Sequence, residues 1–366
     1  MFSAALWSVE HKGVEKVTQP AHDNPVWKFL DEIATKKGIT EIVINSPKSV
    51  FVERDGKFIQ LNVGFEKNEV ITFIQEIAKF NQKSCDADNP ILDGNLPDGS
   101  RINVIVEPFS TGNPAITIRR YLRNIKTFAS SPGVFCLFDQ WIEFFKSAVK
   151  ARCNIVVAGG TGVGKTTFLN LLLQEIPHDE RVITIEDTRE LNFDHPNLVR
   201  LEAARKNLAS DKLVSLRDLV KNTLRMRPDR IIIGEVRGGE LFDLLQAMNT
   251  GHDGSMTSIH ASSTGECIQR METLFLLAGF DVPHKVVRQM ISTAVDFIVQ
   301  LSRSKDGKRI VAEIIELTGM DGDTILHQTI ASFDADDGGL KMADVAPQCL
   351  AKLHEQGGLP LAFFQG

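Results

Sequence analysis

Short, wholly apolar runs alternate with longer stretches of mixed character from residue 154 onward. Uninterrupted apolar runs of this length predict strands that are buried on both faces, as in parallel sheets, and the stretches between them predict helices. Another helix is expected at residues 139–150. The sequence therefore predicts an α/β domain over residues 139–317, with a parallel sheet covered by helices. Its strands are expected at residues 154–158, 181–186, 229–234, 255–259 and 296–301.

The first third of the chain shows a different order of elements. Strands and helices that follow one another in this way favour a smaller α+β domain, over residues 24–123. Residues 124–138, which contain Ser-Ser-Pro-Gly, have the composition of a linker. Residues 1–23 are polar and irregular, so they are expected to form a flexible N-terminal arm. The predicted helices of the α+β domain are 27–34 and 68–81, and its strands are 41–45, 50–54, 101–106 and 115–120.

The end of the chain is more polar than the α/β region, with turns rich in Asp and Gly after residue 317. A strand is expected at residues 324–333 and a short helix at 347–356. Residues 318–366 are therefore predicted to form a small C-terminal cap.

The composition narrows the class of protein. A chain of 366 residues is too long for one ordinary hydrophobic core and indicates two domains. Its 43% hydrophobic and 24% charged residues are typical of globular domains. The net charge of -6 disfavours a polybasic nucleic-acid or membrane binder. The five cysteines include no C-x-x-C pair, and the N-terminus lacks a signal-peptide pattern. We therefore expect a cytoplasmic protein without a disulfide framework, and no apolar run reaches the roughly 18 residues that span a bilayer.

The strongest chemical signal is the run GGTGVGKTT at residues 159–167, which matches G-x-x-x-x-G-K-[ST]. A predicted strand precedes it and a helical pattern follows it, and this context favours a phosphate site over a chance glycine-rich turn. Glycines let the backbone wrap a phosphate, so that N–H groups and the helix N-terminus face the anion. Lys165 is expected to reach the β- and γ-phosphates of ATP, and Thr166 to ligate Mg²⁺. The residues predicted to bind nucleotide are Gly160, Thr161, Gly162, Val163, Gly164, Lys165, Thr166 and Thr167.

Two acidic motifs follow this loop. Glu235 comes just after the apolar strand 229–234, as in a Walker B motif, and is expected to hold Mg²⁺ through water and to polarise the attacking water. Without the loop upstream, a buried strand with an exposed Glu would be the better interpretation. Glu186 ends the strand 181–186 within TIEDTREL and is predicted to act near the attacking water or the metal. Taken alone, this second motif fits an exposed acidic turn equally well.

One histidine and three arginines complete the candidate catalytic set. His260 follows the strand 255–259 and is expected to contact or sense the γ-phosphate. A lone histidine is more often structural, and no third soft ligand favours a metal site. Arg101, Arg119 and Arg120 belong to the α+β domain. Guanidinium groups stabilise the charge that builds up in phosphoryl transfer, sometimes from across an interface, although most arginines are solvated or salt-bridged.

Four sequence boxes stand in fixed order: GGTGVGKTT, TIEDTREL, RMRPDRIIIGEVRGGE and TGHDGSMTSIHA. Together they resemble the secretion ATPase superfamily of bacterial type II and type IV secretion and pili (GspE/VirB-type). The phrases LPDGSRINVIVEP, ITIRR, LQAMNTGHDGS and HQTIASF are similar to its CpaF-type branch, the motors of tight-adherence (Flp) pili. Two features depart from the pattern. Val163 replaces the usual serine of the loop, and the paired-cysteine zinc motif of the pilus-assembly and type II branches is missing.

The resemblance implies a RecA-like P-loop domain preceded by a PAS-like α+β domain, with nucleotide held between the two in a homohexameric ring. On matching positions it implies that Lys165 and Thr166 bind phosphate and Mg²⁺. It implies that Glu235 is the Walker B residue, that Glu186 belongs to the acidic box and that His260 belongs to the His box. The arginines that it implies approach the phosphates are Arg101, Arg119 and Arg120.

The resemblance also implies an ATP-hydrolysing motor that powers assembly or retraction of a pilus, or a secretion machine. Such a motor would work with a platform protein at the cytoplasmic face of the inner membrane. The acidic balance of the chain disfavours direct contact with nucleic acid. Two alternatives stay open. One is a type IV secretion ATPase that moves protein or DNA through a channel, and the other is a non-hydrolysing, nucleotide-binding scaffold.

Overall fold

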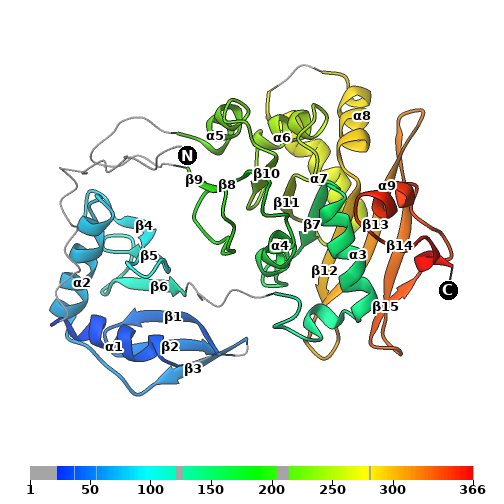
Figure 1. Ribbon diagram of the computed structural model, residues 1–366. Helices are drawn as coiled ribbons and strands as arrows, with labels where there is room; N and C mark the ends of the chain where they lie inside the picture. Colours follow the sequence, from blue (N-terminus) through cyan, green and yellow to red (C-terminus); the bar gives the residue numbers. More distant parts are fainter. Residues whose placement is uncertain are drawn as a thin grey trace, which may run out of the picture. The chain divides into compact units, whose positions relative to one another are not determined.

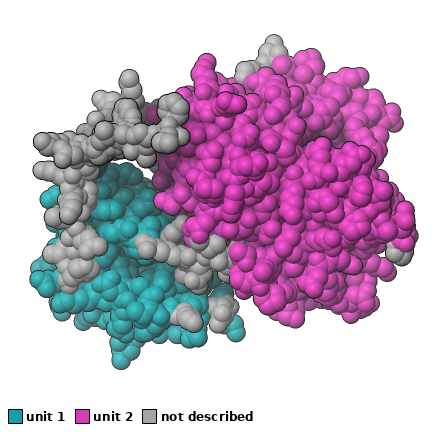
Figure 2. Space-filling model, in the orientation of Figure 1, with its two compact units in different colours: residues 1–122, 207–211 teal, residues 123–206, 212–366 magenta. Residues whose placement is uncertain are grey.

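A computed structural model describes residues 23–36, 38–54, 56–120, 127–203, 214–279 and 282–365. The chain divides into two compact units, shown in different colours in Figure 2. The first comprises residues 1–122 and 207–211, and the second residues 123–206 and 212–366. The predicted N-terminal arm lies outside the described residues except for Asp23.

The first unit is an antiparallel sheet with two helices packed against it (Figure 1). The strand order is β3-β2-β1-β6-β5-β4. Alternate residues of the central strands, such as Ile44, Val104 and Ile116, are fully buried in one core with both helices, so the other residues lie on the opposite face. Its elements are α1 (Pro25–Ala34), β1 (Ile39–Ser46), β2 (Ser49–Arg54), β3 (Lys57–Leu61), α2 (Lys67–Phe80), β4 (Ile91–Asn95), β5 (Arg101–Ile105) and β6 (Ala115–Arg119).

The second unit is built on a nine-stranded mixed sheet with the order β15-β14-β13-β12-β7-β11-β10-β8-β9. The strands from β12 to β9 in this order are parallel, and β13, β14 and β15 add to them as antiparallel neighbours. The strands are β7 (Ile155–Gly159), β8 (Val182–Glu186), β9 (Leu198–Glu202), β10 (Arg230–Ile233), β11 (Met256–His260), β12 (Phe297–Arg303), β13 (Arg309–Asp321), β14 (Thr324–Asp334) and β15 (Gly339–Met342).

Helices cover both faces of this sheet, as the uninterrupted apolar strands require. Along β7, Ile155 and Val157 enter the core formed with α3 and α4, whereas Val156 and Ala158 enter the core formed with the helices from α5 to α8. The helices are η1 (Val134–Cys136), α3 (Asp139–Lys150), α4 (Lys165–Leu173), α5 (Leu216–Thr223), α6 (Glu240–Met248), α7 (Thr264–Leu277), α8 (His284–Ala294), α9 (Leu350–Glu355) and η2 (Leu361–Phe364).

The end of the chain differs from the predicted separate cap. Strand β13 runs through the expected boundary at residue 317, and a two-residue hairpin loop connects it to β14 in the same sheet. The Trp141 indole N–H of α3 donates to the Leu340 carbonyl at 2.9 Å, and Leu353 of α9 is buried in the same core. The Asp- and Gly-rich turn that indicated a boundary is therefore a hairpin turn, with Gly322 at φ 59° in the first loop position, where two-residue hairpin loops favour glycine.

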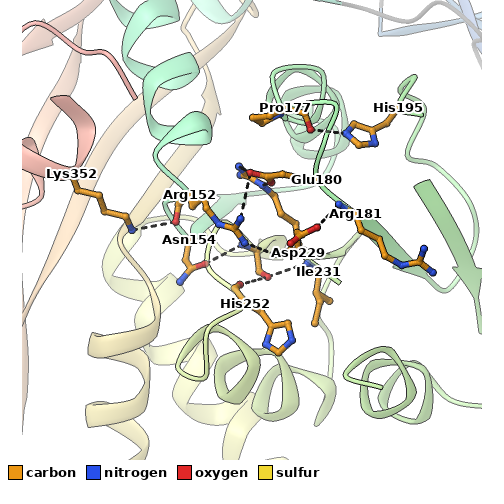
Figure 3. A network of polar contacts seen from close by, with 12 residues as sticks. Arg152, Asn154, Pro177, Glu180, Arg181, His195, Asp229, Ile231, His252 and Lys352 are labelled. Atoms are coloured by element: carbon orange, nitrogen blue, oxygen red, sulfur yellow. Dashed lines mark hydrogen bonds and ion pairs between the residues drawn. The ribbon is translucent and has the colours of Figure 1, made fainter. Parts of the chain in front are cut away.

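A polar network lies at the edge of the sheet where the parallel strands begin (Figure 3). The guanidinium group of Arg230, at the start of β10, is fully buried and contacts both carboxylate oxygens of Glu180 through Nε and a terminal nitrogen. Arg152 also contacts Glu180 and donates to the Asp229 carbonyl at 2.8 Å. The Asp229 carboxylate in turn accepts from the Arg181 N–H at 2.6 Å. The network thus fixes the starts of β8 and β10 to the end of α3.

Candidate functional site

The loop between β7 and α4 leaves room for an anion. Gly162 and Gly164 have φ values of 72° and 101°, in the left-handed region that glycine adopts without strain. Apart from Gly160 and its two chain neighbours, no heavy atom of the described residues lies within 4 Å of a Cβ placed on Gly160. Gly164 is the N-cap of α4, so the helix N-terminus faces the same space. This geometry is that of a phosphate cradle.

The outer side of the loop is closely packed. Val163, at the position where a serine was expected, is buried, and a Cβ on Gly159 would lie only 2.6 Å from its Cγ2. A Cβ on Gly164 would lie 3.0 Å from the ring of Phe135, which also packs edge-on against Phe168 of α4. The glycines are therefore required by the packing behind the loop as well as by the open space in front.

Lys165 lies in the cradle with its side chain 11% exposed. Its ammonium group donates to the Gly159 and Gly160 carbonyls, both at 3.0 Å, and lies 3.6 Å from a carboxylate oxygen of Glu235. Burial lowers the pKa of Lys165 below its usual value, and the Glu235 carboxylate opposes that shift. The lysine is thus a positioned cation at the mouth of the anion site.

Thr166, the second residue of α4, donates its hydroxyl hydrogen bond to Glu190 at 3.1 Å. Glu190 was quoted in the acidic motif but was not among the predicted site residues. The available signal was its place in the short acidic loop that directly follows β8. Thr167 is half-buried in the first turn of α4, and Thr161 is exposed on the loop.

Glu186 is the last residue of β8 and is only 4% exposed. One carboxylate oxygen accepts the backbone N–H groups of Glu190 and Leu191, both at 2.8 Å. Burial raises the pKa of Glu186 to about 7, against the lowering effect of these two hydrogen bonds. A Cβ on Gly234 would lie 3.0 Å from the Glu186 Cγ, so the carboxylate sits directly against the segment that carries Glu235.

The raised pKa of Glu186 predicts a specific pH dependence of stability. Because the folded state holds this proton up to about pH 7 and the unfolded chain only to about 4.5, the free energy of unfolding should fall as pH rises between these values. Glu186→Gln should remove this contribution, which is on the order of 3 kcal/mol. Urea unfolding of the wild type and of Glu186→Gln at pH 5 and pH 8 would check this pH dependence. A wild-type-minus-variant difference that does not change with pH would contradict the prediction.

Glu235 follows β10 and is held between two cations. One oxygen faces Lys165, and the other accepts from the Arg237 Nε at 2.7 Å. The segment is fixed by Glu240, whose carboxylate accepts the backbone N–H groups of Arg237 and Gly238. Neighbouring β11 also contributes, because the Ser258 hydroxyl donates to the Gly234 carbonyl at 2.7 Å. The carboxylate is therefore fixed in place next to the cradle.

His260 is the last residue of β11 and is exposed. Its Cα partner in the parallel pairing with β7 is Gly159, the residue that opens the phosphate loop. Glu186, Glu235 and His260 thus lie at the ends of three neighbouring strands, at the carboxyl edge of the sheet, where open α/β sheets bind their ligands.

The three arginines of the first unit have different surroundings. Arg101 and Arg119 are cross-strand partners on β5 and β6, and Arg119 is also paired with Glu41 on β1. The guanidinium group of Arg120 instead donates to four backbone carbonyls at and after the end of α1, those of Ile33, Ala34, Lys36 and Ile39. Arg120 therefore closes a helix end within its own unit, which occupies the donors that a phosphate contact would need.

The donor set suits a nucleotide with a hard cation. The open cradle, the Lys165 ammonium and the α4 N-terminus are complementary to phosphate, and the oxygens of Thr166, Glu190 and Glu235 are of the kind that Mg²⁺ prefers. Within the described ranges, no group of three or more His, Cys, Asp or Glu side chains forms a metal site. Mg²⁺ in nucleotide sites commonly uses one or two protein ligands together with the phosphates.

The fold and the site together define a RecA-like P-loop protein with a smaller α+β domain before it. The chain belongs to the type II/IV secretion system protein family, whose model matches residues 21–333. It is similar to a putative conjugal transfer protein of Mycobacterium tuberculosis, with 32% identity over 89% of this chain and 92% of the relative. It is also similar to the type IV secretion system protein VirB11 of Brucella suis, with 33% identity over 76% of this chain and 84% of the relative.

A solved structure supports the fold. The ATPase DotB of Legionella pneumophila matches with a TM-score of 0.56 and 22% identity, covering 83% of each chain. None of the helices in the described part of the chain is long and apolar enough to cross a membrane.

Proposed function

We propose that this chain hydrolyses ATP to ADP and phosphate in a Mg²⁺-dependent reaction at the loop of residues 159–167. The observation that carries the proposal is the position of Lys165, anchored on two loop carbonyls in the phosphate cradle and 3.6 Å from Glu235. A cation and a carboxylate so placed beside an anion site can bind the γ-phosphate and activate the water that attacks it. The membership of the secretion family supports the same activity.

Each residue has a defined part in this proposal. The loop N–H groups and Lys165 bind and orient the phosphates, and Glu235 accepts the proton of the attacking water. Mg²⁺, held by the Thr166 hydroxyl and through water by Glu235, would neutralise charge on the β- and γ-phosphates. Glu186, with its pKa near neutrality, can hold or release a proton beside Glu235. His260, whose strand partner Gly159 opens the loop, would contact the γ-phosphate.

The arginines are assigned by their geometry. We propose that Arg101 and Arg119, which share one face of the first sheet, approach the phosphates of a nucleotide in an assembled ring. For Arg120 we propose the structural role at the end of α1 in place of the predicted phosphate contact.

We further propose that hydrolysis drives a homohexameric motor at the cytoplasmic face of the inner membrane, coupled to a platform protein. The family and the names of the relatives favour secretion through a type IV channel and pilus assembly or retraction over other uses of ATP. The similarity to a VirB11 protein and to a conjugal transfer protein specifically favours the channel ATPase as a second candidate. The CpaF-type pilus branch remains a prediction from the sequence phrases.

Removal of the metal tests the proposal. The purified protein should turn over ATP with Mg²⁺, stop when EDTA is added and recover when Mg²⁺ is restored in excess, because the charge on the phosphates is otherwise uncompensated. Phosphate release is measured across the oligomer fractions of a sizing column, with and without the candidate platform protein. Bound nucleotide with no phosphate release under any of these conditions would reject the enzyme and favour the non-hydrolysing scaffold.

A further inference from the structure

The turn after His260 contacts a half-buried carboxylate, that of Glu313 on β13. Thr264, the first residue of α7, is 7% exposed, and its hydroxyl donates to Glu313 of β13 at 2.7 Å. The other Glu313 oxygen accepts the Thr329 hydroxyl of β14 at 3.1 Å. Hydrogen bonds to a charged acceptor are about twice as strong as neutral ones, so this carboxylate joins α7 firmly to the C-terminal hairpin.

A second polar side chain holds the same turn. Gln300 of β12 is 5% exposed and is the cross-strand partner of Glu313. Its amide nitrogen donates to the Ala261 carbonyl at 3.3 Å and to the Leu301 carbonyl at 3.1 Å, which fixes the orientation of the amide. Its amide oxygen has no hydrogen-bond partner within the part of the chain that the structure describes. A buried amide with an unpaired oxygen carries a cost that an apolar residue would avoid.

The pairing of β12 with β13 is irregular at this position. Gln300 is opposite Glu313, but the next residue, Leu301, is opposite Val311, so Ala312 is an extra residue on β13. Such β-bulges redirect side chains and are frequent beside active sites. Leu301 is also the β7 partner of Gly159, and Gly159 is the partner of His260. The bulge is therefore level with the first residue of the phosphate loop.

We infer that Glu313 and Gln300 are positioning residues for His260. They fix the turn from Ala261 to Thr264, and thereby the end of β11, against the strand that carries the phosphate loop. Neither side chain is needed to touch nucleotide. The inference rests on the proposed function, because the catalytic importance of His260 is part of that proposal.

Substitutions at two glutamates of the same strand separate positioning from simple stability. Glu313→Leu should lower kcat for ATP hydrolysis about ten- to hundredfold, because small displacements of catalytic groups lower rates by this much. The KM for ATP should change by no more than about twofold. Glu313→Gln should recover most of kcat, because its amide oxygen can still accept from Thr264. The matched control is Glu316→Leu, also on β13. Glu316 is buried and accepts the backbone N–H groups of Gln348 and Cys349, so its loss should lower Tm and leave kcat within about twofold.

Two further measurements keep the test decisive. Thr264→Val exchanges only the hydroxyl for a methyl group and should reproduce the loss of kcat if Glu313→Leu does not fold. The His260 ring resonances, assigned with His260→Asn, should shift in Glu313→Leu or Thr264→Val and stay in place in Glu316→Leu. Equal effects of the Glu313 and Glu316 changes on kcat and on these resonances would overturn the inference. A wild-type protein that binds but does not hydrolyse ATP would reject the proposed function instead, and the resonances would still decide the positioning role.

Discussion

Replacing Lys165 by alanine is expected to abolish measurable ATP turnover and to weaken nucleotide binding at least tenfold. The side chain is the positioned cation of the cradle, with its ammonium group on the Gly159 and Gly160 carbonyls. Removal of one preorganised donor to a developing charge typically costs about 10²–10³ in kcat, and here the phosphates also lose a ground-state partner. Phosphate release and the binding of a fluorescent ATP analogue would measure the two effects separately.

Two controls define what this result means. Glu235→Gln should lower turnover by a similar factor while keeping nucleotide affinity, because its carboxylate is assigned to water activation. Lys150→Ala changes an exposed lysine at the end of α3 and should leave both properties as in the wild type. Full turnover in Lys165→Ala would show that the site lies elsewhere in the chain.

Glu180→Gln is expected to lower the free energy of unfolding of the second unit by about 3 kcal/mol. Arg230 is fully buried against this carboxylate, and loss of one partner leaves the other charge uncompensated inside the protein. Urea unfolding monitored by tryptophan fluorescence would report it, since Trp141 is in the core of this unit.

An exposed ion pair of the same unit provides the control. Asp306→Asn breaks the contact with Lys308, and both side chains are more than half exposed, so little change in stability is expected. The double variant Glu180→Leu with Arg230→Met should lose less stability than Glu180→Gln alone, because the fully buried charge of Arg230 is then removed together with its partner. A loss in Glu180→Gln no larger than that of the Asp306 control would contradict the prediction.

The parts of the fold that the sequence predicted are those whose pattern is set by burial. Strands β7, β8, β10, β11 and β12 are buried along nearly all of their length, and each was placed within two residues at either end. Helix α3 was predicted with its observed limits. In contrast, β3 is exposed along nearly all of its length and β9 is an edge strand of partly buried residues, so neither has an apolar pattern to recognise.

The residues of the candidate site likewise differ in how far the sequence could predict their contacts. The loop, Glu186, Glu235 and His260 could be grouped in advance because the carboxyl ends of parallel strands meet at one edge. Contacts between distant parts of the chain could not be predicted from the sequence. The Glu190 contact to Thr166, the two threonines on Glu313 and the carbonyls around Arg120 depend on which surfaces face each other after folding. Arginine has many possible partners, and its sequence position alone does not select one.

Contacts between distant segments also set the order in which the second unit can fold. Central strand β7 needs β12 at its side, and the Trp141 indole finds its acceptor 199 residues later, at Leu340. The Lys352 ammonium likewise donates to the Arg152 carbonyl 200 residues earlier. Contacts of such long range form slowly. During synthesis, β7 and the strands on one side of it emerge before β12, its neighbour on the other side, has been made. The core of the unit can close only when residues 340–352 have left the ribosome, so the newly made chain depends on this late segment before it can acquire a finished nucleotide site.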